Sequence, residues 1–227
     1  MASIGCYPVK GVRAIRVAKL VEAGNPDCPL TNGSAFNMAA TGVRTDDIIS
    51  TGQLIERRAG DGTICASFQT PDVVTGMNIE VDVCQFDFEF ISVVTGVPVI
   101  LAGAVTRGVK SLQADQSPAP VQVDIWADRI LNGALAPAPY QYMRITLPYV
   151  KFQAPKFDEL SGDDFATLTL TGIASYNNVI ADGAWNDYPE SLSERLWAWW
   201  GTNDVPDITV SPYTAGCGFL NTPACAS

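Results

Sequence analysis

The sequence predicts a mainly β fold in which two packed antiparallel sheets form a sandwich or barrel with one short flanking α-helix. The first indication is a series of short strand-like runs, separated by Gly, Pro, Asn and Asp turn signals at fairly regular spacing. The second is residues 77–96, where a strand pattern passes directly into one helical pattern. Since no repeat or boundary divides the 227 residues, we expect one domain over residues 1–227. Residues 1–10 are expected to form an N-terminal arm and residues 205–227 a C-terminal extension.

Residues 77–96 give the clearest local prediction. Apolar and polar side chains alternate from Met77 to Val83, which is typical of a half-buried antiparallel strand. The apolar residues that follow have the i, i+4, i+7, i+8 spacing of one helical face: Phe86, Phe90, Val93 and Val94. Gly96 is expected to end this helix.

The other elements are predicted from alternation and turn residues. Strands are expected over residues 12–20, 36–43, 48–58, 63–68, 97–107, 121–125, 140–150 and 165–173. Gly60, Asp61 and Gly62 should turn one strand back onto the next as a hairpin. In residues 121–125, Gln122 and Asp124 alternate with apolar residues, as in a strand. Residues 191–200 fit either a capped helix or an aromatic-rich strand.

Composition favours a self-associating structural protein. Apolar residues make up 47% of the chain and charged residues only 17%, against about 25% in typical soluble domains. A surface so poor in charge is expected to be covered partly by copies of itself. The net charge of −10 argues against a surface that grips nucleic acid by its phosphates. No segment is predicted to insert into a membrane, and without a secretory signal the chain is expected in a reducing cytosol.

The absence of histidine excludes most catalytic arrangements within one chain. Ser-His-Asp triads, Cys-His pairs and HExxH zinc sites all need it. The six cysteines show no C-x-x-C spacing, so we expect reduced thiols, with Cys65 and Cys84 buried or half-buried and Cys217 and Cys225 able to pair on oxidation. We therefore predict no metal, no cofactor and no enzymatic activity.

Two sets of residues leave other functions open. Three adjacent carboxylate pairs could serve a hydrolase if partners met in space, although neighbours on a strand face opposite ways: Asp46–Asp47, Asp158–Glu159 and Asp163–Asp164. Tryptophans gather near the C-terminal part, at Trp185, Trp197, Trp199 and Trp200. They could form a sugar platform, but closely spaced tryptophans are more often core or contact anchors. We favour Trp197, Trp199 and Trp200 as subunit-contact anchors.

The order of motifs resembles the major tail tube protein of long, non-contractile-tailed (siphovirus-type) bacteriophages, in the form found in phages of actinobacteria. The resemblance covers about residues 11–207. Its motifs are QLIE followed by AGDGTIC in the hairpin, then NIEVDVC, FDFEFISVVTGVPVI, VQVDIWAD, LPYV and FATLTLTGIAS. The hairpin leading into NIEVDVC with its helix, and VDIWAD, are the most specific of them.

The resemblance implies a structural virion protein, assembled in the bacterial host cytoplasm and located in the tail. Its subunits would form hexameric rings that stack around a tape-measure protein. Double-stranded DNA would pass through the channel without specific binding, and tail terminator and baseplate proteins would be further partners. The expected loop over residues 43–53, with Asp46, Asp47 and Gln53, and the C-terminal extension are candidates for ring-to-ring contact. The alternatives are a terminator or baseplate ring protein of the same fold, or a carbohydrate-binding decoration or adhesin module.

Overall fold

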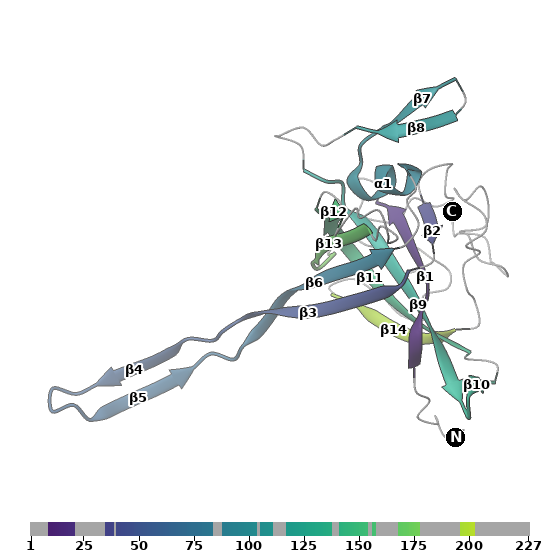
Figure 1. Ribbon diagram of the computed structural model, residues 1–227. Coiled ribbons are helices and arrows are strands. Elements are labelled where there is room, and N and C mark those ends of the chain that lie inside the picture. Colours follow the sequence, from purple (N-terminus) through teal and green to yellow (C-terminus); the bar gives the residue numbers. More distant parts are fainter. Residues whose placement is uncertain are drawn as a thin grey trace, which may run out of the picture.

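The predicted mainly β fold with a short flanking helix is confirmed. The computed structural model describes residues 9–20, 35–38, 40–83, 88–103, 105–110, 117–137, 141–153, 156–157, 168–177 and 196–202. Figure 1 shows curled antiparallel sheets, one helix at their upper end and a long two-stranded projection. The elements are β1 (Val9–Lys19), β2 (Ala35–Met38), β3 (Gly42–Ser50), β4 (Leu54–Arg58), β5 (Ile64–Gln69), β6 (Val73–Val83), α1 (Phe88–Thr95), β7 (Val99–Ala102), β8 (Val105–Val109), β9 (Val121–Leu131), β10 (Ala134–Leu135), β11 (Tyr142–Phe152), β12 (Lys156–Phe157), β13 (Leu168–Ala174) and β14 (Ala198–Thr202).

The main sheet branches at β11. Its strand order is β2-β1-β9-β11-β13-β6-β3, and β14 also pairs with β11. The first half of β11 pairs with β14, from Tyr142 to Thr146, whereas Val150 and the residues after it pair with β13. Between these halves lies Pro148, which has no N–H to donate, and the register against β9 shifts there. The branch lets one long strand belong to both sides of the curled sheet.

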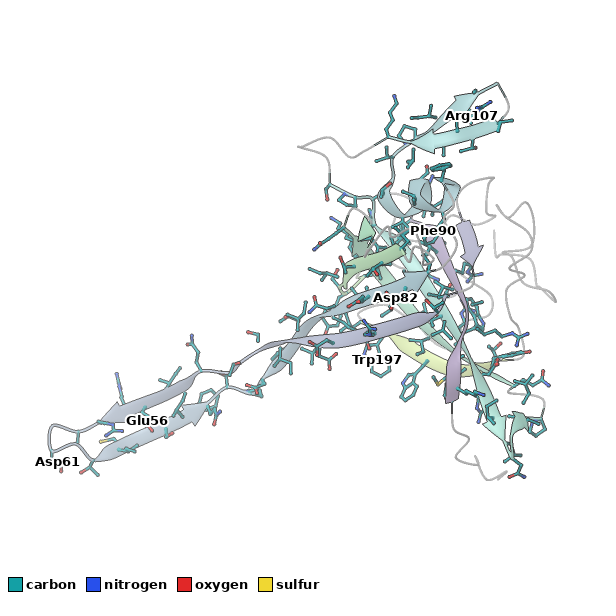
Figure 2. The ribbon with its side chains drawn as sticks, viewed as in Figure 1. Glu56, Asp61, Asp82, Phe90, Arg107 and Trp197 are labelled. Carbon is teal, nitrogen blue, oxygen red and sulfur yellow. The ribbon has the colours of Figure 1, made fainter. Side chains whose placement is uncertain are left out.

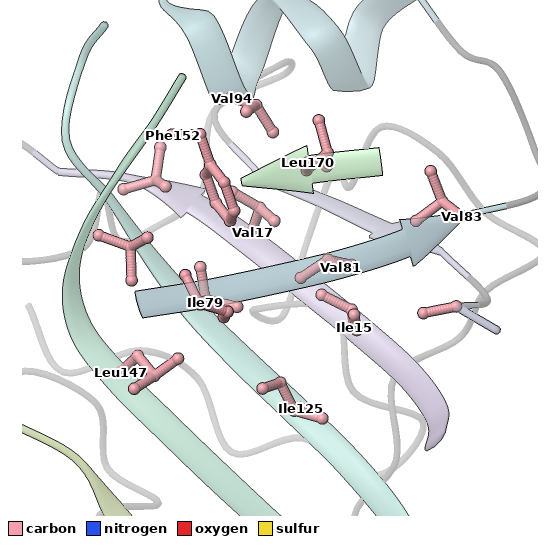
Figure 3. Close-up of a cluster of buried hydrophobic side chains, with 14 of the residues drawn as sticks. Ile15, Val17, Ile79, Val81, Val83, Val94, Ile125, Leu147, Phe152 and Leu170 are labelled. Atoms are coloured by element: carbon pink, nitrogen blue, oxygen red, sulfur yellow. The ribbon is translucent and has the colours of Figure 1, made fainter. Parts of the chain in front are cut away.

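The hydrophobic core lies between the curled sheet and α1, as Figure 3 shows. The alternation predicted from Met77 to Val83 is confirmed, because its apolar members are buried and Asn78 is exposed. The helix contributes Phe90, Val93 and Val94 to the same core. Gly96 ends the helix with φ +74°, and a Cβ there would lie 2.7 Å from the Cβ of Ala119. Phe86 lies outside the described residues.

Three predicted strands were wrong in extent. The strand expected over residues 36–43 is divided between β2 and β3, because β2 pairs with β1 and β3 pairs with β6. The strand expected over residues 48–58 is interrupted after Ser50 and resumes as β4. The strand expected over residues 97–107 is a hairpin, β7 and β8, which turns at Gly103 with φ +67°. A turn inside an apolar run gave no alternation to reveal it.

The strand predicted over residues 121–125 is present but longer, since β9 continues to Leu131. From Val121 to Ala127 every residue of β9 is buried, including Gln122 and Asp124. Cys65 corrects another expectation, since it is exposed. Of the two patterns left open for residues 191–200, a strand is present in the described part, where β14 begins at Ala198.

Several predictions lie outside the described residues. They concern residues 1–8 and 205–227, the carboxylate pairs Asp158–Glu159 and Asp163–Asp164, and the other five cysteines. In the part of the chain that is described, no helix has the length and apolar character needed to cross a membrane.

Candidate assembly surface

The most prominent surface feature is a long β-hairpin that leaves the body of the protein. Its inner part, β3 and β6, pairs from Gly42 with Asp82 to Ser50 with Val73. The outer part, β4 and β5, continues away from the body, as Figure 2 shows. We call residues 49–73 the arm. Every residue of the arm is exposed except Gly52 and Thr70, which are partly buried.

The arm is divided by a joint at Gly52. A Cβ at this position would lie 1.7 Å from the backbone oxygen of Thr70, so only glycine fits. The Gly52 N–H donates to Oδ1 of Asp72 at 2.7 Å, and the Gln53 N–H donates to Oγ1 of Thr70 at 2.7 Å. The Thr70 N–H in turn donates to the Gln53 carbonyl at 3.1 Å. The joint therefore fixes how the outer hairpin continues the inner one.

The outer hairpin carries apolar side chains on both of its faces. Ile55 lies opposite Phe68 on one face, with exposed fractions of 58% and 63%. Leu54 and Ile64 alternate onto the other face and are also exposed. Neither face packs on the described part of the body, so both are exposed to water in the single subunit.

The tip of the arm is ordered by local polar contacts. The predicted turn is confirmed: the Gly62 N–H donates to the Ala59 carbonyl at 2.9 Å, and β4 returns as β5. The Thr63 N–H donates to Oδ1 of Asp61 at 2.9 Å, which lowers the pKa of that carboxyl. Arg58 and Glu56 form an ion pair at 2.9 Å. These contacts define the turn without covering the apolar side chains.

The three predicted ring-contact residues lie at the base and the joint of this hairpin. The predicted loop over residues 43–53 was wrong, because residues 42–50 are strand β3, whose alternation the turn-like Asp46–Asp47 pair obscured. Asp46 and Asp47 are both exposed and, as neighbours on a strand, point to opposite faces. Gln53 acts through its backbone at the joint. Their contact with another ring stays a prediction.

The predicted tryptophan anchors gather at β14. Trp197, just before this strand, and Trp199 are exposed, and their rings meet at 5.6 Å with an interplanar angle of 69°. The edge-to-face arrangement is one of the two that aromatic rings prefer. Trp200 pairs through its backbone with Arg144 of β11, and its side chain lies outside the described residues.

A buried ion cluster, which the sequence did not reveal, joins β1, β9 and β11. Asp124 of β9 accepts from Arg16 of β1, with Nη2 at 2.6 Å, and from Arg144 of β11, with Nη2 at 3.1 Å. Thr146 and Gln122 also donate to the Asp124 carboxylate. Burial raises the pKa of Asp124, but the two guanidinium groups outweigh this effect and lower the pKa to about 2. Each guanidinium also lies near the ring of Trp126, at 5.4 and 5.0 Å.

The Asp124 cluster links strands and is closed to ligands. Asp124 and its two arginine partners are at most 1% exposed, so no substrate reaches this carboxylate. Among the described residues, no group of three His, Cys, Asp or Glu side chains is close enough together to hold a metal ion. What the described surface offers is an exposed arm, open strand edges and exposed aromatic side chains.

No protein-family model matches this chain, and no curated protein sequence does. Among solved structures, it is similar to a PVC sheath/tube terminator of an extracellular contractile injection system in the extended state, with 16% identity, a TM-score of 0.37 and coverage of 76% of this chain and 96% of that one. It is also similar to a chain of the PVC sheath-tube complex, with 16% identity, a TM-score of 0.36 and coverage of 75% and 89%. A third match is the tube-terminating cap of the anti-feeding prophage, with 15% identity, a TM-score of 0.36 and coverage of 77% and 95%. At TM-scores below 0.5 this likeness carries no weight for function, which has to come from the chain's own residues.

Proposed function

We propose that this protein is a structural subunit of a phage-type tail tube. Copies form hexameric rings, the rings stack into a tube, and the tube serves as the channel for genome delivery. The observation that carries this proposal is the arm, because it exposes apolar side chains on both faces and no described residue of its own subunit covers them. In this role the protein is not an enzyme and is located in the virion tail after assembly in the bacterial host cytoplasm.

The arm is expected to be only marginally stable in a free subunit. A two-stranded hairpin on its own is marginal in water. Burying its exposed Leu, Ile and Phe side chains would contribute on the order of 1 kcal/mol or more each. Since the two faces need cover at the same time, we infer that the arm inserts between other copies instead of lying along one surface.

Open strand edges provide a second reason for self-association. Within the described residues, β2, β3 and β14 each pair with a neighbour on one side only. Unpaired edges invite pairing with another chain, and closure into a ring satisfies them. Trp197 and Trp199 lie beside one such edge and would anchor a neighbouring subunit there.

The acidic balance of the chain suits a passage for DNA. With 24 acidic and 14 basic residues, the subunit offers few cations to hold phosphates. A negatively charged channel would repel the DNA backbone and let it slide without specific binding. Tape-measure, tail terminator and baseplate proteins would be the other partners of such a tube.

A tail terminator or baseplate ring of the same fold is the second candidate. Such a ring would also close the strand edges, but it would cover the arm on one side of the ring only.

The test of both candidates is negative-stain electron microscopy of the purified protein over a range of concentrations. Long tubes support the tail tube, isolated rings that never stack support the terminator, and a monomer at every concentration contradicts both.

A further inference from the structure

A groove lies on the outer face of β3, β6 and β13, beside the base of the arm. Two adjoining hollows of about 570 and 450 Å³ share Gln153 and Ile173. Ile173 is 46% exposed and forms the apolar part of the groove. This surface is the one left when the opposite face of the same strands packs into the core.

The larger hollow is lined by more carboxylates than cations, although most of its surface is apolar. Asp46 and Glu80 line it, and Asp82 lies next to them on β6. The cation among them is Arg44, which is 2.8 Å from Oε1 of Glu80 and 3.7 Å from Oδ2 of Asp82. Lys151 lines the smaller hollow, with Nζ 5.9 Å from the ring centre of Tyr149. We call the larger hollow, with Ile173, the acidic groove.

The β7–β8 hairpin has the complementary character. Residues 97–110 contain Arg107 and Lys110 and no carboxylate, in a chain whose net charge is −10. Three apolar side chains of this hairpin are exposed to 44–59%: Ile100, Leu101 and Val105. Its inner end is held by Val109, which packs against the core. The outer end is a two-stranded hairpin with no apolar cover, which is marginal by itself.

The hairpin cannot serve the groove of its own subunit. It stands beyond α1 and packs against that helix, whereas β3, β6 and β13 lie on the other side of the helix (Figures 1 and 2). Residues of these three strands line the groove. A β7–β8 hairpin that reaches this groove therefore belongs to another copy. A second copy offers a segment with both the charge and the exposed apolar side chains that the groove lacks.

We propose that the β7–β8 hairpin of one copy docks in the acidic groove of the next copy. Arg107 and Lys110 face Asp46 and Glu80, and the apolar side chains of the hairpin cover Ile173. Because hairpin and groove are different surfaces, each docked copy presents another free groove, so the contact propagates into a ring or a filament. The inference rests on the proposed function and names the surfaces through which neighbours join.

The test is charge reversal with rescue. Replacing Arg107→Glu and Lys110→Glu should raise the concentration needed for half-assembly at least about tenfold, since close like charges at an interface oppose association. Adding Asp46→Lys and Glu80→Lys in the same chain should restore assembly to within about threefold of the native value. The matched control adds Asp47→Lys with Glu80→Lys; Asp47 points away from the groove, so this pair should restore less.

Assembly is measured by sedimentation and electron microscopy, and circular dichroism confirms that every variant is folded. The docking is overturned if the Arg107→Glu, Lys110→Glu variant assembles like the native protein. It is also overturned if Asp46→Lys with Glu80→Lys fails to restore assembly. Neither result affects the proposed tail tube as long as the native protein forms tubes. Rescue in rings that never stack would support the docking and contradict the tube. A native protein that stays monomeric contradicts both.

Discussion

Asp124 is fully buried and links strands that are separated in the sequence. Its carboxylate bridges Arg16, 108 residues away, and Arg144, 20 residues away. A buried carboxylate between two guanidinium groups is stable only as a complete set, because removing the anion leaves the cations close together in a low-dielectric interior. The cluster therefore fixes the registers of β1, β9 and β11 from the face opposite the core.

Asp124→Asn should destabilise the folded subunit by about 3–5 kcal/mol, the range for removing one partner from a buried ion pair. The measurement is urea unfolding followed by circular dichroism. Glu80→Gln is the matched control, because its pair with Arg44 is exposed and should contribute about 1 kcal/mol or less. Equal losses in the two variants would contradict the role given to the cluster.

Acid should weaken the protein through the same carboxylate. The pKa of Asp124 in the folded state, about 2, is below the ordinary value of 3.8. Its stabilising contribution is therefore complete above about pH 4 and is lost as the pH falls from about 4 through 2. This difference in pKa corresponds to roughly 2 kcal/mol of folding free energy. Unfolding free energies measured across this window should fall more steeply in the native protein than in Asp124→Asn, and parallel curves would refute the assignment.

At the scale of elements, the arm depends on one residue for its geometry. Gly52→Ala places a methyl group where the Thr70 carbonyl oxygen lies, so the joint must open. Since the joint is outside the core, we expect the melting temperature of the body to change by no more than about 2 °C. Tube formation should fail. Gly60→Ala is the control, because no atom lies within 4 Å of its new Cβ; loss of assembly in both variants would show that the joint is not the cause.

The two apolar faces of the arm can be tested separately. Ile55→Thr with Phe68→Thr removes one face, and Leu54→Thr with Ile64→Thr removes the other. Threonine keeps the strand propensity, so the hairpin itself should remain. If the arm inserts between copies, each pair should abolish or strongly reduce tube length in electron micrographs. Full-length tubes from either variant would mean that the corresponding face is not buried.

The sequence predicted those elements whose cause lies in neighbouring residues, and it missed features whose cause lies far away in the chain. Met77 to Val83 and Gly96 were predicted correctly, because alternation and a helix-ending glycine are local patterns. The joint at Gly52 was not, because its cause is the Thr70 backbone on the returning strand. The burial of Asp124 was missed for the same reason. Its one trace in the sequence is a pair of arginines that directly adjoin apolar residues on both sides: Arg16 in IRV and Arg144 in MRI.

For the whole molecule, the division between a stable body and an unsupported arm decides what a free subunit is like. The body holds the hydrophobic core, the helix and the ion cluster, whereas arm residues 54–69 are all exposed. Backbone hydrogen bonds in an exposed hairpin open easily, because few packed side chains resist opening. The hairpin of the free subunit should therefore open often despite its local contacts, and assembly should hold it closed.

Hydrogen–deuterium exchange can distinguish an arm that opens often in the free subunit from one that is already rigid before assembly. In the free subunit, amides of β4 and β5 should exchange within seconds, while those of β9 and β11 remain protected for hours. In assembled particles, the β4 and β5 amides should slow by at least about a hundredfold, since exchange then requires the arm to leave its neighbours. The Ile55→Thr, Phe68→Thr variant, kept at a concentration where it stays unassembled, serves as the reference for the free arm. Strong protection of β4 and β5 in the free subunit would contradict frequent opening, and fast exchange in intact tubes would show that the arm is not the contact that holds them.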